Sequence, residues 1–207
     1  MWYVCFAIAL ISYLLGGVNG AIIISQAVYH EDIRELGSKN PGFTNFKRIH
    51  GFGGTTFAVM AIDVLKTIAP VLTARLVMDG MYGEGQLGAA IALFCCMLGH
   101  SFPVWYRFQG GKAVLAALSG VWFVDWRMGL ICFGLFAVIL LTVKYMSVAS
   151  MSFGILVPIV LALLGCQNWV TLSAMSLAGL LIVVRHYANI KRLMAGTESK
   201  FYLKSKK

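Results

Sequence analysis

The sequence predicts an all-α membrane protein with about seven transmembrane helices, formed by a single domain over residues 1–207. Two observations predict this class. Hydrophobic residues make up 59% of the chain and charged residues only 12%, against roughly 25% charged residues in soluble domains. Long apolar runs are separated by short polar segments, and a chain of this length has room for about seven spans of roughly 20–25 residues.

The apolar segments are the candidate spans. In chain order they cover 2–27, 53–78, 85–99, 112–124, 128–143, 147–165 and 168–185. The segment 112–124 is shorter than the roughly 17 residues that a full span needs, so we expect a partial or tilted helix. The segment 53–78 contains Asp63, Lys66 and Pro70, so two short helices are an alternative to one long helix. We expect Asp63 and Lys66 to pair inside the bundle, because each charge would cost about 2.5–3.5 kcal/mol if it faced lipid.

The distribution of basic residues predicts the orientation of the chain. With seven spans, one side of the bilayer receives Lys39, Lys47, Arg48, Arg107, Lys112, Lys144, Lys191, Arg192, Lys200, Lys204, Lys206 and Lys207. The other side receives Arg127 alone. The positive-inside rule therefore places the N-terminus outside and the C-terminus in the cytoplasm. We assign the net charge of +9 to contacts with membrane lipids, and we expect no nucleic-acid partner.

The cysteines are expected to be small buried hydrophobic residues. Cys5, Cys95, Cys96, Cys132 and Cys166 all lie in or at the edge of apolar segments, without a C-x-x-C pair. We therefore expect no metal site and no disulfide. The first apolar segment begins at Trp2 with no basic residue before it, so we expect it to be a span and not a cleaved signal peptide.

The polar run between the first two spans, residues 32–48, is a candidate ligand site. It combines glycines, which let backbone N–H groups approach a ligand, with hydroxyl and amide donors and with positive charge. These features indicate an anionic ligand, and a phosphate fits them best. The candidate binding residues are Ser38, Asn40, Gly42, Thr44, Asn45 and Arg48.

A second polar segment, residues 99–112, ends in a glycine pair followed by a lysine. We expect this turn to open the next helix, whose N-terminus would present free N–H groups and a positive dipole end to an anion. The spacing is not that of a Walker A loop, because the upstream glycine is absent. The candidate binding residues here are His100, Gly110, Gly111 and Lys112.

A third polar segment follows the last span. We expect His186 and Asn189 to share a face at the end of a helix, close to Arg192. An imidazole and an amide at that place can bind or protonate a phosphate. The alternative is a basic tail that rests in lipid headgroups, which we favour for Lys204, Lys206 and Lys207. Ser147 and Ser150 could either line a pocket on the same side or pack helices together.

In their order and spacing, the three polar segments resemble the bacterial acyl-phosphate-dependent glycerol-3-phosphate acyltransferase family. Its members share Gly-Ser-x-Asn-x-Gly-x-Thr-Asn, then Gly-His-x-Phe-Pro-Val ending in Gly-Gly-Lys-Gly, then His-x-x-Asn-Ile-x-Arg-Leu-x-x-Gly-x-Glu. This chain has the corresponding stretches at 37–45, 99–112 and 186–198. The resemblance covers nearly the whole chain.

The resemblance implies transfer of an acyl group from acyl phosphate to the 1-hydroxyl of glycerol 3-phosphate, giving lysophosphatidic acid and phosphate. This is the first acylation of phospholipid synthesis, and it uses neither acyl-CoA nor acyl carrier protein as direct donor. The resemblance implies no cofactor. It places the protein in the bacterial cytoplasmic (inner) membrane with its active site on the cytoplasmic face, and it makes the enzyme that produces acyl phosphate a candidate partner.

The resemblance also assigns roles to single residues. Ser38 and Arg48 match residues linked to substrate binding and catalysis, and Lys112 matches a phosphate-binding lysine. His186 and Asn189 match the catalytic pair of the last motif. We expect direct attack by the glycerol hydroxyl, with His186 or a donor phosphate oxygen as the base. Ser38 is less suited to act as a covalent nucleophile, because no general base lies beside it in the sequence.

Three positions depart from the family pattern. Lys39 and Phe43 stand where many relatives have Gly and Ala, and Ala113 stands where Gly usually follows the lysine. These changes leave the charged and hydrogen-bonding positions in place. They therefore bear on the fit around the phosphate more than on the reaction class.

A small transporter of a phosphorylated metabolite is the alternative from another class, since it would use the same basic segments. Such transporters place polar residues deep in several spans and often have two similar halves. Here the polar residues are concentrated on one side, and we find no clear internal repeat. A scaffold protein with lipid-binding loops would explain the charge but not the spacing of Gly, Asn and His.

Overall fold

The computed structural model describes residues 1–201, and in that part of the chain the regular elements are all helices. They are α1 (Trp2–Gly16), α2 (Gly20–Tyr29), α3 (Phe43–His50), α4 (Gly54–Tyr82), α5 (Gly85–Ser101), the 3-10 helix η1 (Val104–Tyr106), α6 (Val114–Val124), α7 (Trp126–Val143), α8 (Met146–Leu163), α9 (Trp169–Arg185) and α10 (Tyr187–Met194). The predicted all-α class is confirmed. The tail lysines Lys204, Lys206 and Lys207 lie outside the described residues, so their role remains a prediction.

Five segments are long and apolar enough to cross a membrane. They are Trp2–Tyr29, Gly54–Tyr82, Gly85–Tyr106, Trp126–Val143 and Met146–Leu163. Helices α9 and α10 add a sixth candidate if they count as one span bent by 51°. Helix α6 has only 11 residues, in keeping with the short segment expected there. The count of seven spans remains a prediction.

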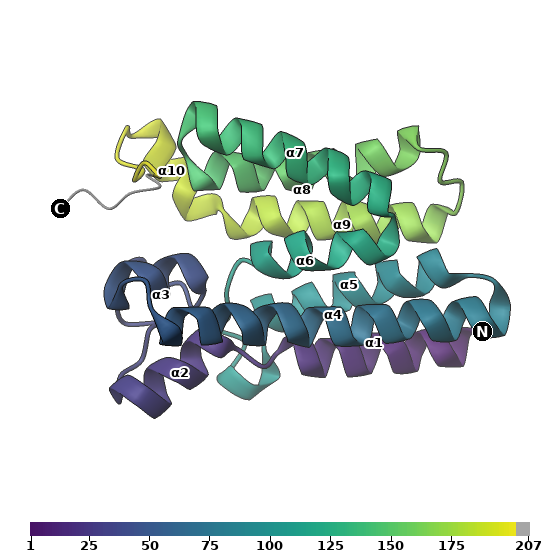
Figure 1. Cartoon of the computed structure of the whole chain (residues 1–207), viewed down its shortest axis with the longest axis horizontal. Coiled ribbons are helices and arrows are strands. Elements are labelled where there is room, and N and C mark those ends of the chain that lie inside the picture. The colour runs from purple at the N-terminus through teal and green to yellow at the C-terminus, as the bar shows by residue number, and fades with distance from the viewer. Residues whose placement is uncertain (202–207) are drawn as a thin grey trace.

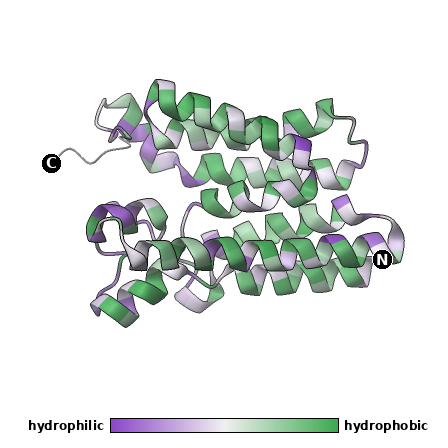
Figure 2. Cartoon of the chain, viewed as in Figure 1, coloured by the Kyte–Doolittle hydropathy of each residue, from purple (hydrophilic) through white to green (hydrophobic). Residues whose placement is uncertain are grey.

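The helices form two layers with α6 between them (Figure 1). Helices α1, α4 and α5 form one layer, and α7, α8 and α9 form the other. The N-terminus lies at one end of the bundle, and α3 and α10 lie at the opposite end. Hydrophilic residues gather at the end with α3 and α10, while apolar residues cover most of the long helices (Figure 2).

Helix α5 occupies the centre of the bundle and packs against α1 at very short range. A Cβ atom on Gly16 or Gly99 would collide with the backbone of the facing helix. Small residues at helix contacts permit this close approach in membrane proteins. The contact fixes the C-terminal end of α5, and with it His100, beside the junction of α1 and α2.

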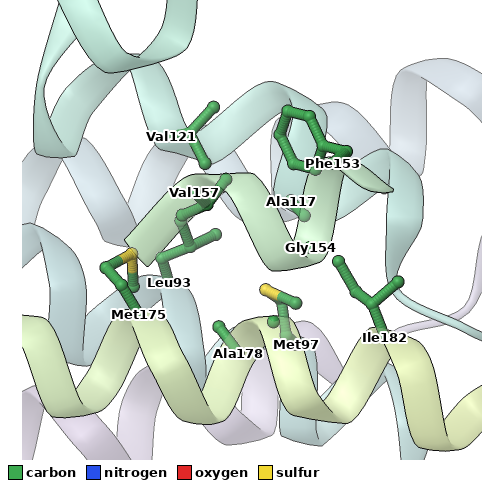
Figure 3. A pocket seen from close by; sticks show the side chains of 11 residues that line it. Leu93, Met97, Ala117, Val121, Phe153, Gly154, Val157, Met175, Ala178 and Ile182 are labelled. Atoms are coloured by element: carbon green, nitrogen blue, oxygen red, sulfur yellow. The ribbon is translucent and has the colours of Figure 1, made fainter. Parts of the chain in front are cut away.

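A small apolar pocket lies where α5, α6, α8 and α9 meet (Figure 3). Its lining includes Leu93, Met97, Val121, Phe153 and Met175. Its volume is about 10 Å³, which is too small for a substrate, and its wall offers no polar atoms to hold a water molecule. This region is therefore part of the hydrophobic core.

The long segment after the first polar run is one continuous helix, α4, which rules out the alternative of two short helices. Pro70 lies inside it and cannot donate a hydrogen bond to the carbonyl of Lys66. The thiol of Cys96 on α5 lies 3.8 Å from that carbonyl oxygen and 3.5 Å from the Thr67 hydroxyl. A neighbouring helix thus supplies a partner for the group that proline leaves free, so the helix continues.

Other boundaries differ from the expected ones. The first span is broken between α1 and α2, where the Asn19 side chain accepts a hydrogen bond from the Ile22 amide at 3.0 Å and caps α2. Helix α3 overlaps the end of the polar run 32–48 and is an element that we did not predict. The glycine turn leads into α6 as expected, but the helix begins two residues after Lys112, at Val114, because Ala113 has φ +57°.

Candidate active site

The three polar segments meet at one cavity of about 540 Å³, at the end of the bundle with α3 and α10. It brings together predicted residues from all three segments. They are Ser38, Asn40, Gly42, Thr44, Asn45, Arg48, His100, Lys112, His186, Asn189 and Arg192. Two predicted residues, Gly110 and Gly111, do not line the cavity.

The first segment is held in place by the side chain of Asn45, which projects from α3. Its Oδ1 accepts a hydrogen bond from the Ser38 amide at 2.9 Å, and its Nδ2 donates to the Leu36 carbonyl at 3.0 Å. Gly37 lies between them with φ +55°, a conformation that favours glycine. Asn45 therefore shapes the turn that brings Ser38 to the cavity wall.

The glycine turn has a different position from the one we predicted. The carbonyls of Gly110 and Gly111 accept hydrogen bonds from the Arg185 guanidinium at 2.6 and 3.0 Å. The Gly111 amide donates to the His100 carbonyl at 3.0 Å, and a Cβ on either glycine would collide with His100. The glycines thus permit close packing, and Lys112 is the residue of this turn that lines the cavity.

A chain of hydrogen bonds connects the second and third segments. Lys112 Nζ donates to Asn189 Oδ1 at 2.5 Å, and Asn189 Nδ2 donates to Glu198 Oε1 at 2.7 Å. Arg192 Nε donates to the other oxygen of Glu198 at 2.7 Å. Glu198 lines the cavity but was not among our candidates, although it is the last residue of the third motif.

Burial and neighbouring charges set the protonation of these groups. Burial, followed by the positive charge of Arg192, lowers the pKa of Lys112 to about 8. Burial alone would raise the pKa of Glu198, but hydrogen bonds from Asn189 and Arg192 bring it below its usual value. The cavity therefore contains an ionised carboxylate beside a lysine that changes charge near neutral pH.

We expected His186 and Asn189 to share a face at the end of a helix. Asn189 lies in α10, and His186 lies between α9 and α10, where the chain bends. It precedes α10 directly, and both residues nevertheless line the cavity. Its Nδ1 lies 2.7 Å from the Ile182 carbonyl oxygen. Since a carbonyl only accepts hydrogen bonds, Nδ1 carries the hydrogen, and in the neutral ring Nε2 keeps a lone pair.

One wall of the cavity is apolar. It is formed by Val114, Leu115 and Leu118 of α6, Phe136 of α7 and Met146 of α8. The sequence predicted an apolar bundle but not which side chains face the site. Ser147 and Ser150 also line the cavity. Within residues 1–201, no three His, Cys, Asp or Glu side chains are grouped so as to hold a metal ion.

Comparison with known proteins identifies the family. The glycerol-3-phosphate acyltransferase family matches residues 6–196. The chain belongs to this family. Among its acyltransferase relatives, the glycerol-3-phosphate acyltransferase of Thermoanaerobacter sp. (strain X514) is 35% identical over 192 residues, 93% of each chain. That of Shouchella clausii (strain KSM-K16) is 36% identical over 198 residues, 94% of each chain.

Two crystal structures of an acyltransferase have the same fold. Both are of PlsY, an integral membrane glycerol 3-phosphate acyltransferase. The glycerol 3-phosphate form has a TM-score of 0.83 and 30% sequence identity, and the match covers 96% of each chain. The lysophosphatidic acid form has a TM-score of 0.80 and 29% identity, covering 96% of this chain and 95% of that one. The chain is therefore a multi-pass integral membrane member of the acyltransferase family.

Proposed function

We propose that the protein transfers an acyl group from acyl phosphate to the 1-hydroxyl of glycerol 3-phosphate, giving lysophosphatidic acid and phosphate. The observation that carries this proposal is a single cavity with a cationic polar end and an apolar wall. A phosphate suits the first part and an acyl chain the second. Membership of the glycerol-3-phosphate acyltransferase family supports the acceptor, as do the ligands named for the two PlsY structures.

Arg48, Lys112 and Arg192 supply the positive charge that two phosphorylated substrates require. Arg48 lies on α3, Lys112 precedes α6 and Arg192 lies on α10, so the three cations reach the cavity from three different segments. Ser38 and Asn40 would add hydroxyl and amide donors, while Asn45, whose amide hydrogen-bonds to the first segment, would hold Ser38 in place. With three cations in its lining, one cavity can hold the donor and acceptor phosphates at the same time.

The chemistry needs no covalent enzyme intermediate, because acyl phosphate is an activated mixed anhydride. The glycerol hydroxyl oxygen attacks the acyl carbonyl carbon, the bond from that carbon to the phosphate oxygen breaks, and phosphate leaves with the electron pair. The hydroxyl proton passes to Nε2 of His186 or to a phosphate oxygen. The hydrogen bond from His186 to Ile182 favours the first route, since it leaves Nε2 with its lone pair. Asn189 would orient the reacting groups together with Lys112.

The proposal includes a topology. We place the single domain in the bacterial inner membrane with seven crossings, the N-terminus outside and the C-terminus in the cytoplasm. Support comes from the positions of the N-terminus and of α10 at opposite ends of the bundle (Figure 1) and from the basic residues near the cavity. The active site would then face the cytoplasm, where acyl phosphate, glycerol 3-phosphate and the enzyme that makes acyl phosphate would reach it.

Purified protein in detergent micelles tests the reaction directly. With acyl phosphate and glycerol 3-phosphate, we expect release of phosphate together with lysophosphatidic acid, and no product when acyl-CoA replaces acyl phosphate. Proteoliposomes loaded with radiolabelled glycerol 3-phosphate test the transporter alternative. Transport without product would overturn the proposal, and product formation with acyl-CoA alone would overturn the assigned donor.

A further inference from the structure

A buried cluster of charged and polar side chains lies at the wall of the cavity, and the reaction proposed above assigns it no role. It consists of Asp63 and Lys66 on α4 and His100 on α5, all buried within the bundle. The predicted pairing is confirmed, because Lys66 Nζ lies 2.8 Å from Asp63 Oδ1. Asp63 and His100 also line the cavity, so the cluster reaches the site.

The ammonium group of Lys66 has three acceptors for its three hydrogens. They are Asp63 Oδ1 at 2.8 Å, the Val18 carbonyl at 2.5 Å and His100 Nδ1 at 2.9 Å. An ammonium group can only donate hydrogen bonds, so His100 Nδ1 must accept. A charged imidazole would place a second cation in contact with Lys66. His100 is therefore neutral, and its hydrogen lies on Nε2.

The position of Nε2 is also determined. Nε2 packs against Gly111, because a Cβ atom added to Gly111 would collide with it. That added Cβ atom would also lie 3.0 Å from the Pro41 carbonyl oxygen, so Pro41 lies beside the same point. Pro41 belongs to the first polar segment and Gly111 to the second. The Nε2–H group of His100 thus lies at the junction of the two segments that supply most of the phosphate-binding candidates.

The second histidine of the cavity, His186, has the opposite tautomer. His186 donates from Nδ1 to the Ile182 carbonyl at 2.7 Å and leaves its Nε2 as an acceptor. In both cases the partner of Nδ1 determines the tautomer. An ammonium donor makes His100 an Nε2–H donor, and a carbonyl acceptor makes His186 an Nε2 acceptor.

We propose that the two histidines of the cavity are held in opposite tautomers, so that His100 donates a hydrogen bond from Nε2 to a substrate phosphate while Nε2 of His186 accepts a proton. Lys66 is a positioning residue that acts through His100, and the ion pair with Asp63 holds Lys66 in place. The part of this proposal that concerns substrates rests on the proposed function. The tautomers themselves do not depend on it.

Nuclear magnetic resonance of protein labelled with ¹⁵N-histidine, in micelles, tests the tautomers in the intact chain. The ring nitrogen shifts separate Nδ1–H from Nε2–H rings, and His100→Gln and His186→Gln spectra assign the two residues by loss of signals. We expect Nε2–H for His100 and Nδ1–H for His186. Finding the same tautomer for both, or a protonated His100 ring, would overturn the proposal. This readout needs no activity, so an inactive protein would refute the proposed function alone.

The double variant Asp63→Leu/Lys66→Met tests the positioning role. It removes both charges together and leaves neither one buried without a partner, which favours folding. We expect His100 to become a mixture of tautomers while the His186 signals stay unchanged. The KM for at least one of the two phosphorylated substrates should rise by about tenfold or more, as for loss of a charge-assisted or strong hydrogen bond, with kcat much less affected. A purely structural role would lower thermal stability with no change in either readout, and that result would overturn the proposal.

A control variant at Arg75 and a pair of variants at His100 complete the test. Arg75→Met removes a cation from the other end of α4, where Arg75 donates to the carbonyls of Phe123 and Val124 at 2.6 and 3.2 Å. It should lower stability and leave KM and the His100 signals unchanged. In the pair of His100 variants, His100→Gln keeps a hydrogen-bond donor close to the place of Nε2, whereas His100→Asn keeps a donor close to the place of Nδ1. A smaller rise in KM for Asn than for Gln would contradict the donor role of Nε2.

Discussion

At the scale of single residues, backbone conformation makes two departures from the family motifs costly. Lys39 and Ala113 have φ of +59° and +57°, the left-handed region that favours glycine, and many relatives have glycine at both positions. Both positions therefore hold an L-residue in a conformation that favours glycine. An L-residue in this conformation is strained by about 1–2 kcal/mol.

Lys39→Gly should stabilise the protein by roughly 0.5–1 kcal/mol, because it relieves this strain, while the flexibility of glycine in the unfolded chain offsets part of the gain. The Lys39 side chain is exposed, so little packing is lost. Ala113→Gly is the matched variant and should be nearly neutral, since Ala113 is buried and its methyl contributes about 0.8 kcal/mol. Thermal unfolding in one detergent measures both. A lower Tm for Lys39→Gly would show that its side chain makes a stabilising contact.

Lys112 should control the alkaline limb of the pH profile. Its charged form attracts phosphate, and burial together with Arg192 lowers its pKa to about 8. We therefore expect kcat/KM, which reports groups of the free enzyme, to fall as pH rises through about 8. Lys112→Arg should move this fall to higher pH, because arginine stays charged. An unchanged alkaline limb in Lys112→Arg would assign it to another group.

The same shift has a consequence of the opposite sign for stability. The pKa of Lys112 is lower in the folded protein than its ordinary value of 10.5. The unfolded chain therefore binds more protons between about pH 8 and 10.5, and the contribution of Lys112 to the free energy of unfolding rises with pH in that window. Activity and this part of stability should consequently change in opposite directions above pH 8.

At the scale of helices, sequence periodicity and composition predicted the long elements well and the short ones poorly. Helices α3 and α10 have eight residues each and are rich in polar side chains, so they carry no span-like signal. The continuity of α4 depends on Cys96 of a different helix, which lies beside the carbonyl that Pro70 leaves free. A contact of this kind cannot be read from either segment alone.

The apolar wall formed by α6, α7 and α8 should select the length of the acyl chain. Leu118→Trp adds bulk to this wall, so the ratio of kcat/KM for long over short acyl phosphates should fall by about tenfold, on the scale of the 1–3 kcal/mol that pocket contacts contribute to discrimination. Leu141→Trp is the control, because Leu141 lies on α7 with 57% of its surface exposed. Equal effects of both variants would mean that Leu118 does not contact the acyl chain.

At the scale of the whole molecule, the order of the polar segments along the chain predicted most of the cavity. Of the predicted residues, only Gly110 and Gly111 lie outside its lining. They were misplaced because a glycine pair before a helix suggests anion binding, whereas here it makes room for His100. Glu198 was missed although it ends the third motif, and the residues of the apolar wall were missed because nothing local to α6, α7 or α8 marks the side that faces the site.

The bundle also predicts an odd number of membrane crossings. Helix α4, which Tyr82 ends, runs toward the end of the bundle with the N-terminus, and α10, which precedes Lys200 in the chain, lies at the opposite end (Figure 1). In intact cells, a membrane-impermeant maleimide should label Tyr82→Cys and should label Lys200→Cys only after permeabilisation, because basic segments stay in the cytoplasm. The unsubstituted protein measures labelling of the native cysteines. Labelling of both sites from the same side would require an even number of crossings between the two ends, and the reverse pattern would place the cavity outside the cell.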